Sequence, residues 1–300
     1  MTFYRIKERV QASQARPAKS VPLHPPKGIA SERTKPLKTT KNKIVKHKSK
    51  SADTTLFCRH ELKYRIPETK ARAIAQYVRS YISLDRYSKK YPNHEYPISS
   101  LYFDSDKLHL CKETIEGKVN RFKLRIRCYD DLPETTCFFE IKRRFNNVIF
   151  KSRACALKTV VGDVIRGGYI PESLYKDGKE TVKQFQFYLH MLNARPIVLV
   201  RYMRQAFEGD SSNRVRVTFD RQLSFKTTQN PTVTLNGSGW RNVSMNFVVL
   251  EIKFTSKYPR WLSDMVKAFD LKQTAMSKYV SSVKQSCELG FCAPTCGIYR

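Results

Sequence analysis

The stretch FKLRIRCY at residues 122–129 alternates apolar and cationic side chains. Successive side chains of a β-strand point to opposite faces, so this alternation predicts a strand with one basic and one apolar face. The cations that would share the basic face are Lys123, Arg125 and Arg127. The charged side of such a strand must meet either water or an anion.

The same alternation recurs in five further stretches. They are HELKYRI (60–66), FFEIKRR (138–144), FKSRA (150–154), RVRVTFD (214–220) and LEIKF (250–254). Their charged positions of common parity include Glu61, Lys63, Glu140, Lys142, Lys151, Arg153, Arg216, Glu251 and Lys253. One such strand alone is typical of an antiparallel sheet with a solvated face. The repetition of Arg-x-Arg and Glu-x-Lys favours a common ligand-binding face instead.

The periodicity of the whole chain predicts an α+β fold. The expected strands are 58–66, 96–104, 118–130, 136–145, 148–157, 197–208, 214–226 and 243–255, and the expected helices are 67–82, 158–167, 179–193, 259–269 and 275–286. Strands without regular βαβ alternation indicate an antiparallel sheet or barrel, and about eight strands can enclose one ligand. We expect an antiparallel β-barrel, a tunnel with a basic interior, flanked by helices that cover its apolar outside. The alternative is an apolar interior with the charges outside.

The composition implies an anionic partner. The 300 residues carry a formal charge of +30, from 56 Lys+Arg against 26 Asp+Glu. Nucleic acid, an anionic membrane and polyphosphate all fit such an excess. Residues 1–55 are rich in Lys, Pro, Ser and Thr and are predicted to form a disordered basic tail. We expect one tunnel domain at 56–286 and a cysteine-containing tail at 287–300.

The tail and the cysteines bear on localisation and partners. The basic run KTTKNKIVKHKSK (38–50) would hold a membrane-protein partner or an anionic surface, or is only a solvated tail. No apolar run is long enough to span a bilayer and no secretory signal is recognisable, so we expect a cytoplasmic protein. The cysteines expected to be buried free thiols are Cys58, Cys111, Cys128, Cys137 and Cys155. Cys287, Cys292 and Cys296 lack the spacing of a zinc site.

A basic interior would be stabilised by a bound polyanion. Like charges about 4 Å apart repel by roughly 4 kcal/mol at an effective dielectric constant of 20, and a bound polyanion removes this cost. Arginine suits the task because its planar fork grips phosphate oxygens in pairs. Glu61 and Glu140 would either pair with lysine or hold a divalent cation, whereas for Glu251 we favour the metal.

A series of consecutive blocks resembles a known family. The blocks are RHELKYRI, SSLYFDS, FKLRIRCY, FFEIKRR, VRYMRQAF, RVRVTFD, LEIKF and, at 277–279, SKY. In this order, from about Cys58 to Lys284, they resemble the catalytic domain of the vacuolar transporter chaperone (VTC) family, the ATP-dependent polyphosphate polymerases with a triphosphate tunnel fold. The resemblance implies a tunnel that binds ATP and inorganic polyphosphate and transfers the γ-phosphate to a growing chain.

The resemblance also implies roles for individual residues. The phosphate contacts would be Lys63, Arg125, Arg127, Lys142, Arg204, Arg216, Lys253 and Lys278, with Glu251 as ligand of Mn²⁺ or Mg²⁺. Five of these are expected to act in catalysis, namely Arg125, Arg127, Lys142, Arg216 and Lys253. Strand alternation adds four substrate-binding candidates, namely Lys123, Lys151, Arg153 and Arg201. Phosphoryl transfer needs alignment and charge neutralisation more than a protein nucleophile.

Three other functions stay open. A tunnel triphosphatase of the same fold is marked by a Glu-x-Glu-x-Lys strand, but this sequence has Arg59-x-Glu61-x-Lys63, with one acid fewer. The site could also bind polyphosphate or nucleotide without turnover. A nucleic-acid binder should carry stacking aromatics beside its cations, and Tyr64, Phe139 and Phe219 fall on the opposite face. We therefore expect no specific nucleic-acid partner.

Overall fold

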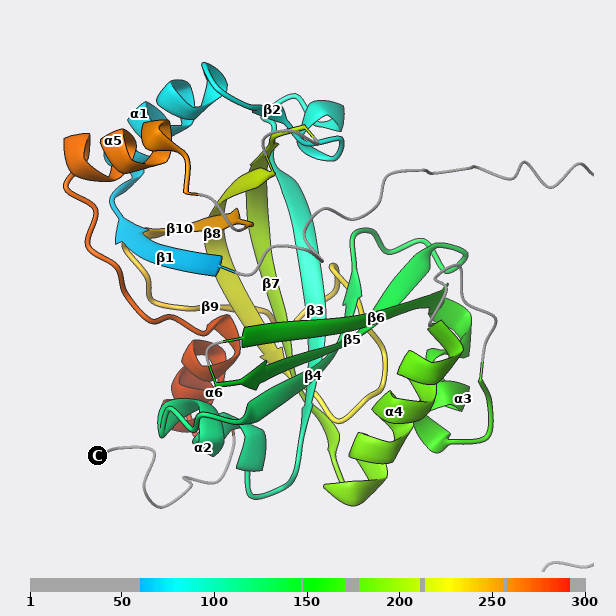
Figure 1. The fold of residues 1–300 in the computed structure, drawn as a ribbon. Coiled ribbons are helices and arrows are strands. Elements are labelled where there is room, and N and C mark those ends of the chain that lie inside the picture. The colour runs from blue at the N-terminus through cyan, green and yellow to red at the C-terminus, as the bar shows by residue number, and fades with distance from the viewer. Residues whose placement is uncertain (1–59, 147, 171–177, 211–213, 256–257, 292–300) are drawn as a thin grey trace, which may run out of the picture. The chain divides into compact units, whose positions relative to one another are not determined.

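The structure, a computed structural model, describes residues 60–146, 148–170, 178–210, 214–255 and 258–291 (Figure 1). The predicted basic tail at 1–55 and most of the predicted C-terminal tail lie outside these residues. Cys58, Arg59, Cys292 and Cys296 are outside them too. Among the described residues no helix is both long enough and apolar enough to cross a bilayer.

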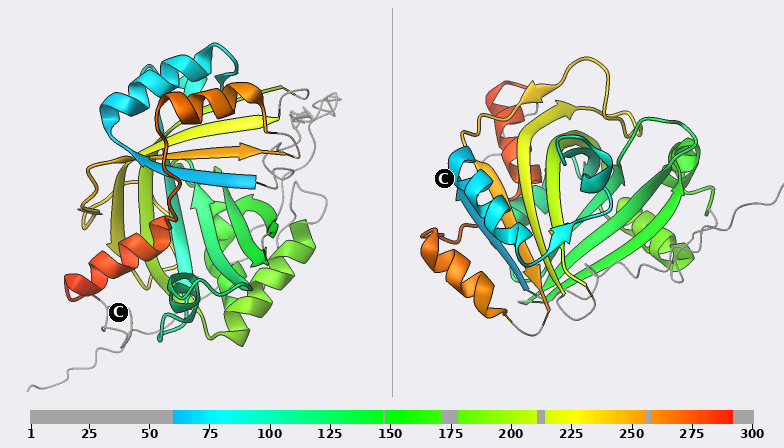
Figure 2. Two further views of the ribbon diagram at one scale, coloured as in Figure 1. Left: turned by 60° about the vertical axis from the view of Figure 1, so that its left-hand side comes forward. Right: turned by 90° about the horizontal axis from the view of Figure 1, so that it is seen from above.

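In the described ranges ten strands form one antiparallel sheet, as the sequence predicted for its eight longest members. The strands are β1 (His60–Ile66), β2 (Ser83–Leu84), β3 (Tyr96–Asp104), β4 (Arg121–Cys128), β5 (Thr136–Phe145), β6 (Val148–Leu157), β7 (Arg195–Glu208), β8 (Val215–Thr227), β9 (Arg241–Asn242) and β10 (Val248–Phe254). Their order is β1-β10-β8-β7-β3-β4-β5-β6, with β2 added on β7 and β9 on β8. The sheet curls so that its two ends turn toward each other (Figure 2). Since β1 and β6 are the two ends of the hydrogen-bonded order, the curl is barrel-like but its ladder stays open there.

The helices are α1 (Glu68–Arg79), α2 (His109–Ile115), α3 (Val161–Arg166), α4 (Gly178–Met191), α5 (Arg260–Ala268) and α6 (Lys278–Glu288), with short 3₁₀ turns η2 (Ser88–Lys90) and η3 (Lys158–Val160). The predicted helix at 158–167 is η3 followed by α3. Helix α2 and the two-residue strands β2 and β9 were not among the predicted ranges, because segments this short carry little periodicity. Strand β4 begins three residues later than predicted, after Gly117 in the left-handed region (φ 70°).

Helices cover the apolar outer face of the sheet at both ends, as expected. Over β4 and β5 the outer cluster comprises Leu124, Ile126, Phe139 and Ile141 against Val182, Phe185 and Leu189 of α4. Phe185 is fully buried and meets Phe103 and Phe139 edge-on, with ring centroids 5.6 and 5.4 Å apart. Truncating such a side chain to alanine costs about 3–5 kcal/mol. Over β1, β8 and β10 the outer cluster comprises Tyr64, Val217, Leu250 and Ile252 against Ile74 of α1 and Leu262 of α5.

Helix α6 lies on the other, concave side of the sheet. Its Tyr279 and Val283 pack with Tyr102 and Val200. The Tyr279 ring stacks on that of Tyr102 at 4.8 Å, and its hydroxyl donates to Asp104 Oδ2 at 2.6 Å. Part of the concave side is thus filled by apolar contacts, and the N-terminus of α6 lies beside the part that remains charged. The helix runs two residues beyond the predicted domain end at 286.

The cysteine prediction is confirmed where the structure describes it. Cys111, Cys128, Cys137 and Cys155 are buried free thiols. Burial raises the pKa of the first three to about 12, so they are not reactive at neutral pH.

Candidate phosphate-binding face

Cross-strand register brings the charged residues together on the concave side. Direct Cα partners include Lys63 with Glu251, Lys253 with Arg216, Arg125 with Glu140, Glu140 with Arg153, Lys123 with Lys142, and Lys142 with Lys151. We call this set the basic face and define it by Lys63, Lys123, Arg125, Arg127, Lys142, Lys151, Arg153, Arg204, Arg216, Lys253 and Lys278, with the carboxylates Glu61, Glu140, Asp220 and Glu251. It contains every predicted site residue except Arg201. The cations outnumber the carboxylates.

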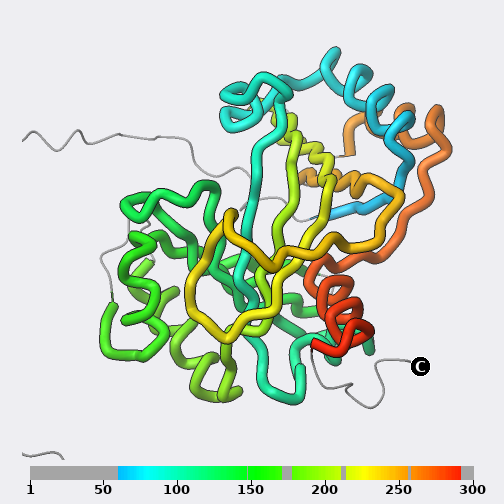
Figure 3. The backbone as a smooth tube through the Cα atoms, turned by 180° about the vertical axis from the view of Figure 1, so that it is seen from behind, coloured from blue at the N-terminus to red at the C-terminus, as the bar shows by residue number. Residues whose placement is uncertain are grey.

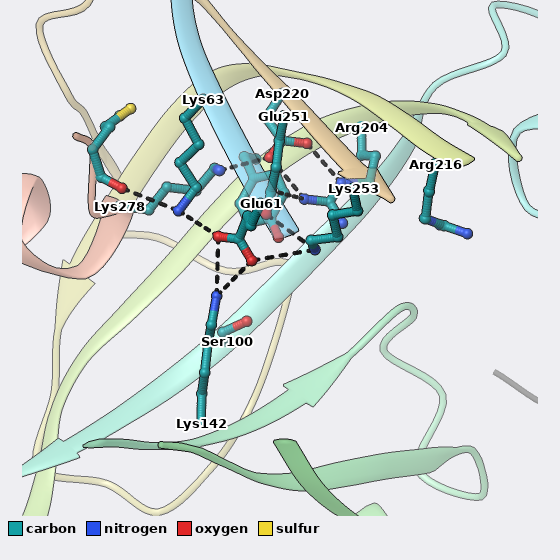
Figure 4. A network of polar contacts seen from close by, with 12 residues as sticks. Glu61, Lys63, Ser100, Lys142, Arg204, Arg216, Asp220, Glu251, Lys253 and Lys278 are labelled. Atoms are coloured by element: carbon teal, nitrogen blue, oxygen red, sulfur yellow. Dashed lines mark hydrogen bonds and ion pairs between the residues drawn. The ribbon is translucent and has the colours of Figure 1, made fainter. Parts of the chain in front are cut away.

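Glu61 holds the lysines of three strands. Lys63 Nζ lies 2.8 Å from its Oε1, and Lys142 Nζ lies 2.9 Å from its Oε2, so the carboxylate bridges β1 and β5 across the open edge of the sheet (Figure 4). Lys253 lies 3.9 Å from Glu61 and 3.0 Å from Glu251. Burial and Glu251 raise the pKa of Glu61, but Lys142, Lys63 and Lys253 outweigh them and lower it to about 2. Glu61 therefore pairs with lysines, one of its two predicted alternatives.

Asp220 organises a second group that the sequence did not reveal. Arg204 donates to both its carboxylate oxygens, at 2.6 and 2.7 Å, and Lys278 Nζ lies 2.6 Å from Oδ2. Burial raises the pKa of Asp220, but Arg204 and Lys278 lower it to about 2. The sequence did offer one signal, because Asp220 and Arg216 occupy positions of the same parity in RVRVTFD and so share a strand face. Arg216 itself is paired with Asp85 at 2.7 Å and Glu208 at 2.8 Å.

Glu140 is the centre of a third group. Its side chain is 1% exposed, and three cations surround it, with Arg125 at 2.7 Å and Lys151 and Arg153 each at 3.0 Å. Although burial raises the pKa of this carboxyl, Lys151, Arg125, Arg127 and Arg153 hold it well below its ordinary value. Glu140 thus takes the pairing role.

Lys123 has a different environment. Its ammonium donates to Ser277 Oγ at 2.8 Å, at the N-cap of α6, and Lys142 is its Cα partner. Burial, followed by Lys63, Lys142, Arg121 and Arg125, lowers the pKa of Lys123 to about 7. The charge on Lys123 is therefore incompletely balanced by its neighbours, and a bound anion would raise the pKa of this lysine again.

Arg201 is the one predicted site residue that lies off the basic face, so its grouping with the other cations by strand alternation does not hold. Arg204 is on the concave side, and a separation of three residues places Arg201 on the outer side of β7. Arg201 Nη1 donates to the carbonyl oxygen of Leu235 at 2.6 Å, and the guanidinium lies 4.3 Å from the Trp240 ring. Both partners belong to the loop between β8 and β9, which crosses over the central strands in Figure 3 and packs Val233 and Leu235 in the outer cluster.

Aromatic side chains accompany the cations, contrary to the expected separation of the two kinds. Arg125 lies over Tyr102 and donates to its hydroxyl at 3.0 Å, while Arg127 donates to Tyr202 Oη at 3.3 Å. Tyr64, Phe139 and Phe219 do lie on the outer side. Tyr102 and Tyr202 are buried, so their rings are not open platforms for nucleic-acid bases.

The basic face fits a divalent cation only together with phosphate. Within the described ranges no three His, Cys, Asp or Glu side chains converge on a metal position. Glu251 offers carboxylate oxygens, and its Cα partner Thr218 has a buried Oγ1 without a hydrogen-bond partner in the described structure. Mg²⁺ is commonly held by one or two carboxylates plus substrate phosphates, and the oxygens of Glu251 and Thr218 suit this kind of binding.

Comparison with known proteins identifies a family that this chain matches. The signature of the VTC domain matches residues 58–287. The vacuolar transporter chaperone complex subunit 4 of Schizosaccharomyces pombe is 21% identical over an alignment of 269 positions, and the match covers 76% of this chain and 37% of that protein. The chain thus spans little more than a third of the length of this curated relative.

Solved structures of low sequence identity also resemble this chain. A protein of Bacillus halodurans whose structure is described as that of an adenylate cyclase is 12% identical (TM-score 0.43). The match covers 73% of this chain and 94% of that one. An assigned adenylyl cyclase from Hippeastrum with dominant triphosphatase activity is 14% identical (TM-score 0.41; 79% and 98% covered). A protein from Pyrococcus horikoshii is 12% identical (TM-score 0.38; 77% and 99% covered).

Proposed function

The chain belongs to the VTC domain family, and we propose on that premise that it synthesises inorganic polyphosphate by transferring the γ-phosphate of ATP to the end of a growing phosphate chain. The donor and the chain would both lie along the basic face.

The observation that carries the proposal is the register of the basic face. Neighbouring strands are about 4.8 Å apart, so a phosphate chain that crosses them meets new cations at every strand. Arg125 on β4, Lys142 on β5 and Lys253 on β10 present such cations from three different strands. Arg125 is held by the buried Glu140, Lys142 by the half-buried Glu61, and Lys253 by the buried Glu251. The cations are therefore oriented before any ligand arrives, which is the arrangement that favours electrostatic catalysis.

Phosphoryl transfer requires charge neutralisation and alignment of the reacting groups. A terminal oxygen of the acceptor chain forms a bond to the γ-phosphorus, the bond between that phosphorus and the β,γ-bridging oxygen breaks, and ADP leaves with the electron pair. Arg125 and Arg127 would bind the oxygens of the transferred group, because guanidinium groups match phosphate geometry in bidentate fashion. Glu251, with Thr218 beside it, would hold Mn²⁺ or Mg²⁺, whose chemistry when bound is to neutralise phosphate charge.

A triphosphatase and a binding protein without turnover are the competing functions. The triphosphatase pattern needs several carboxylates around a metal. On the basic face Glu61, Glu140 and Asp220 are each contacted by two or more cations at 3.0 Å or less, whereas Glu251 has one such contact, which leaves a single carboxylate for a metal. This favours polymer binding over water activation.

Incubation of the purified protein with ATP and Mn²⁺, followed by gel separation of the products, tests the proposal. A ladder of polyphosphate with stoichiometric ADP is the expected result. Release of orthophosphate without a ladder would identify a triphosphatase. No ADP, together with a higher melting temperature in polyphosphate, would identify a binding protein.

A further inference from the structure

Two arginines outside the basic face continue it at one end. Arg121 on β4 and Arg144 on β5 are Cα partners, and each lies two residues from the Lys123–Lys142 pair on its own strand. Residues two apart in a strand point to the same side of the sheet. Arg121 and Arg144 therefore point to the concave side, one row beyond Lys123 and Lys142.

The neighbouring residues of the same strands point to the outer side. Phe122, Arg143 and Phe150 are aligned across β4, β5 and β6. The Phe122 ring packs on that of Tyr188 of the outer helix α4, with centroids 4.4 Å apart. Strand β5 thus carries two consecutive arginines of which Arg143 lies on the outer side and Arg144 on the concave side.

The charge on Arg121 is not balanced by its neighbours. Burial and then the guanidinium of Arg144 lower its pKa, and the carboxylate of Glu113 offsets them only in part. Glu113 is shared with Lys118, at 3.5 Å. Arg121 Nη1 donates to the carbonyl oxygen of Lys118, and Arg144 Nε donates to that of Asn146 at 2.9 Å. A carbonyl oxygen orients a guanidinium without neutralising it, so a phosphate group between the two arginines would relieve their repulsion.

The concave cations of β4 form a line. They are Arg127, Arg125, Lys123 and Arg121, each two residues from the next. At about 3.3 Å per residue the whole line is roughly 20 Å long, and Arg121 lies about 13 Å along the strand from Arg125. The two P–O–P links of a triphosphate are shorter than either distance. A triphosphate bound at Arg125 and Arg127 therefore ends before Arg121, whereas a longer phosphate chain reaches it.

We propose that Arg121 and Arg144 form a subsite for inorganic polyphosphate, which binds the acceptor chain beyond the reacting phosphate and gives long chains an advantage over a triphosphate. The inference rests on the proposed function and assigns the direction in which the chain leaves Arg125 and Arg127. Guanidinium groups suit this task because they bind phosphate oxygens in pairs.

Calorimetric titration with long-chain polyphosphate, inorganic tripolyphosphate and ATP tests this proposal. The protein forms compared are the wild type, the double variant Arg121→Gln/Arg144→Gln and the control Arg143→Gln, which removes the adjacent arginine from the outer side. The double variant should bind long chains about tenfold more weakly for each arginine lost, the usual effect of one charge-assisted hydrogen bond. Its affinity for long chains should also depend less steeply on salt, because fewer phosphate contacts release counterions.

The two short ligands and the control variant are expected to behave like the wild type. Tripolyphosphate and ATP should bind the double variant within about twofold of the wild-type affinity, because distant exposed charges act weakly through water. Their retained binding also shows that the double variant is folded. Arg143→Gln should bind all three ligands as the wild type does.

The outcomes separate the inference from the proposed function. Long-chain affinity that is unchanged in the double variant, or that falls as far in Arg143→Gln, would overturn the subsite. Equal losses for ATP and long chains would place the donor rather than the acceptor chain at Arg121 and Arg144. A wild type that binds long chains but makes none would overturn the polymerase and keep the subsite, and a wild type that binds none of the three ligands would overturn both.

Discussion

Replacing Glu140 by glutamine tests whether the buried carboxylates hold the basic face together. The substitution keeps the size of the side chain but removes the charge that Arg125, Lys151 and Arg153 share at 2.7 to 3.0 Å. Removing one partner of a buried ion pair costs about 3–5 kcal/mol, because the remaining charges stay buried without compensation. For a domain of this size 1 kcal/mol corresponds to about 2–4 °C, so the melting temperature should fall by roughly 6–20 °C.

A polyanion should reverse much of this loss. Saturating ligand at about 100 times its dissociation constant stabilises a folded protein by roughly 2.7 kcal/mol. The Glu140→Gln variant leaves its cations without their carboxylate, so tripolyphosphate should raise its melting temperature more than it raises that of the wild type. Chloride at equal ionic strength should not, because screening by salt lacks the bidentate contacts of phosphate.

The pH dependence supplies an internal check. The pKa of Glu140 in the folded protein lies well below the ordinary value of 4.5. Its stabilising contribution is therefore fully present above about pH 4.5 and is lost as the pH falls through the folded pKa. Wild type and variant should converge in acid, and Glu180→Gln, at an exposed position of α4, should match the wild type throughout. Equal melting temperatures for wild type and Glu140→Gln at pH 7 would refute the reasoning.

Three further predictions concern single residues. Arg127→Gln should lower kcat for chain growth by about 10²–10³, the usual cost of losing one donor to a transition-state oxyanion, whereas Arg201→Gln should leave kcat unchanged. Glu251→Gln should nearly abolish chain growth, and excess Mn²⁺ should restore part of it, since only the charge that attracts the cation is lost. The pKa of Lys123 is about 7 in the folded protein and 10.5 ordinarily. Between these pH values the folded state binds fewer protons than the unfolded state, so stability rises with pH. The destabilising effect of Lys123 is therefore complete below about pH 7 and fades as the pH rises toward 10.5. Lys123→Met should therefore raise the melting temperature at pH 6 more than at pH 10, and tripolyphosphate binding at pH 8 should take up a proton in the wild type but not in this variant.

The measurements can contradict each of these expectations. Arg127 and Arg201 form a matched pair, because both donate to neutral oxygens but from opposite sides of the sheet. Equal damage from the two substitutions would show that the assignment of sides is wrong. Failure of Mn²⁺ to improve Glu251→Gln at any concentration would remove Glu251 from metal binding. Identical proton uptake by Lys123→Met and wild type, in buffers of different ionisation enthalpy, would assign the titration to another group.

Much of the basic face could be predicted from local sequence. The alternation of Lys123, Arg125 and Arg127 with apolar residues determines that they share a face, because the two-residue period of a strand is a property of the backbone. The same rule, applied strictly, separates Arg201 from Arg204, and the error there lay in grouping residues three positions apart. Periodicity also indicated α1, α4, α5 and α6, which bury apolar stripes.

Only the tertiary structure decided which charges meet. Glu61 and Lys142 are 81 residues apart, and Lys123 and Ser277 are 154 apart, so no local pattern encodes their contacts. Strand order and register select one carboxylate for each group of cations, and they leave Lys123 facing Lys142 rather than an acid. Because Coulomb energies and desolvation depend on distance and burial, the lowered pKa of Lys123 and the bridging role of Glu61 exist only once the sheet has curled and α6 has docked on its concave side.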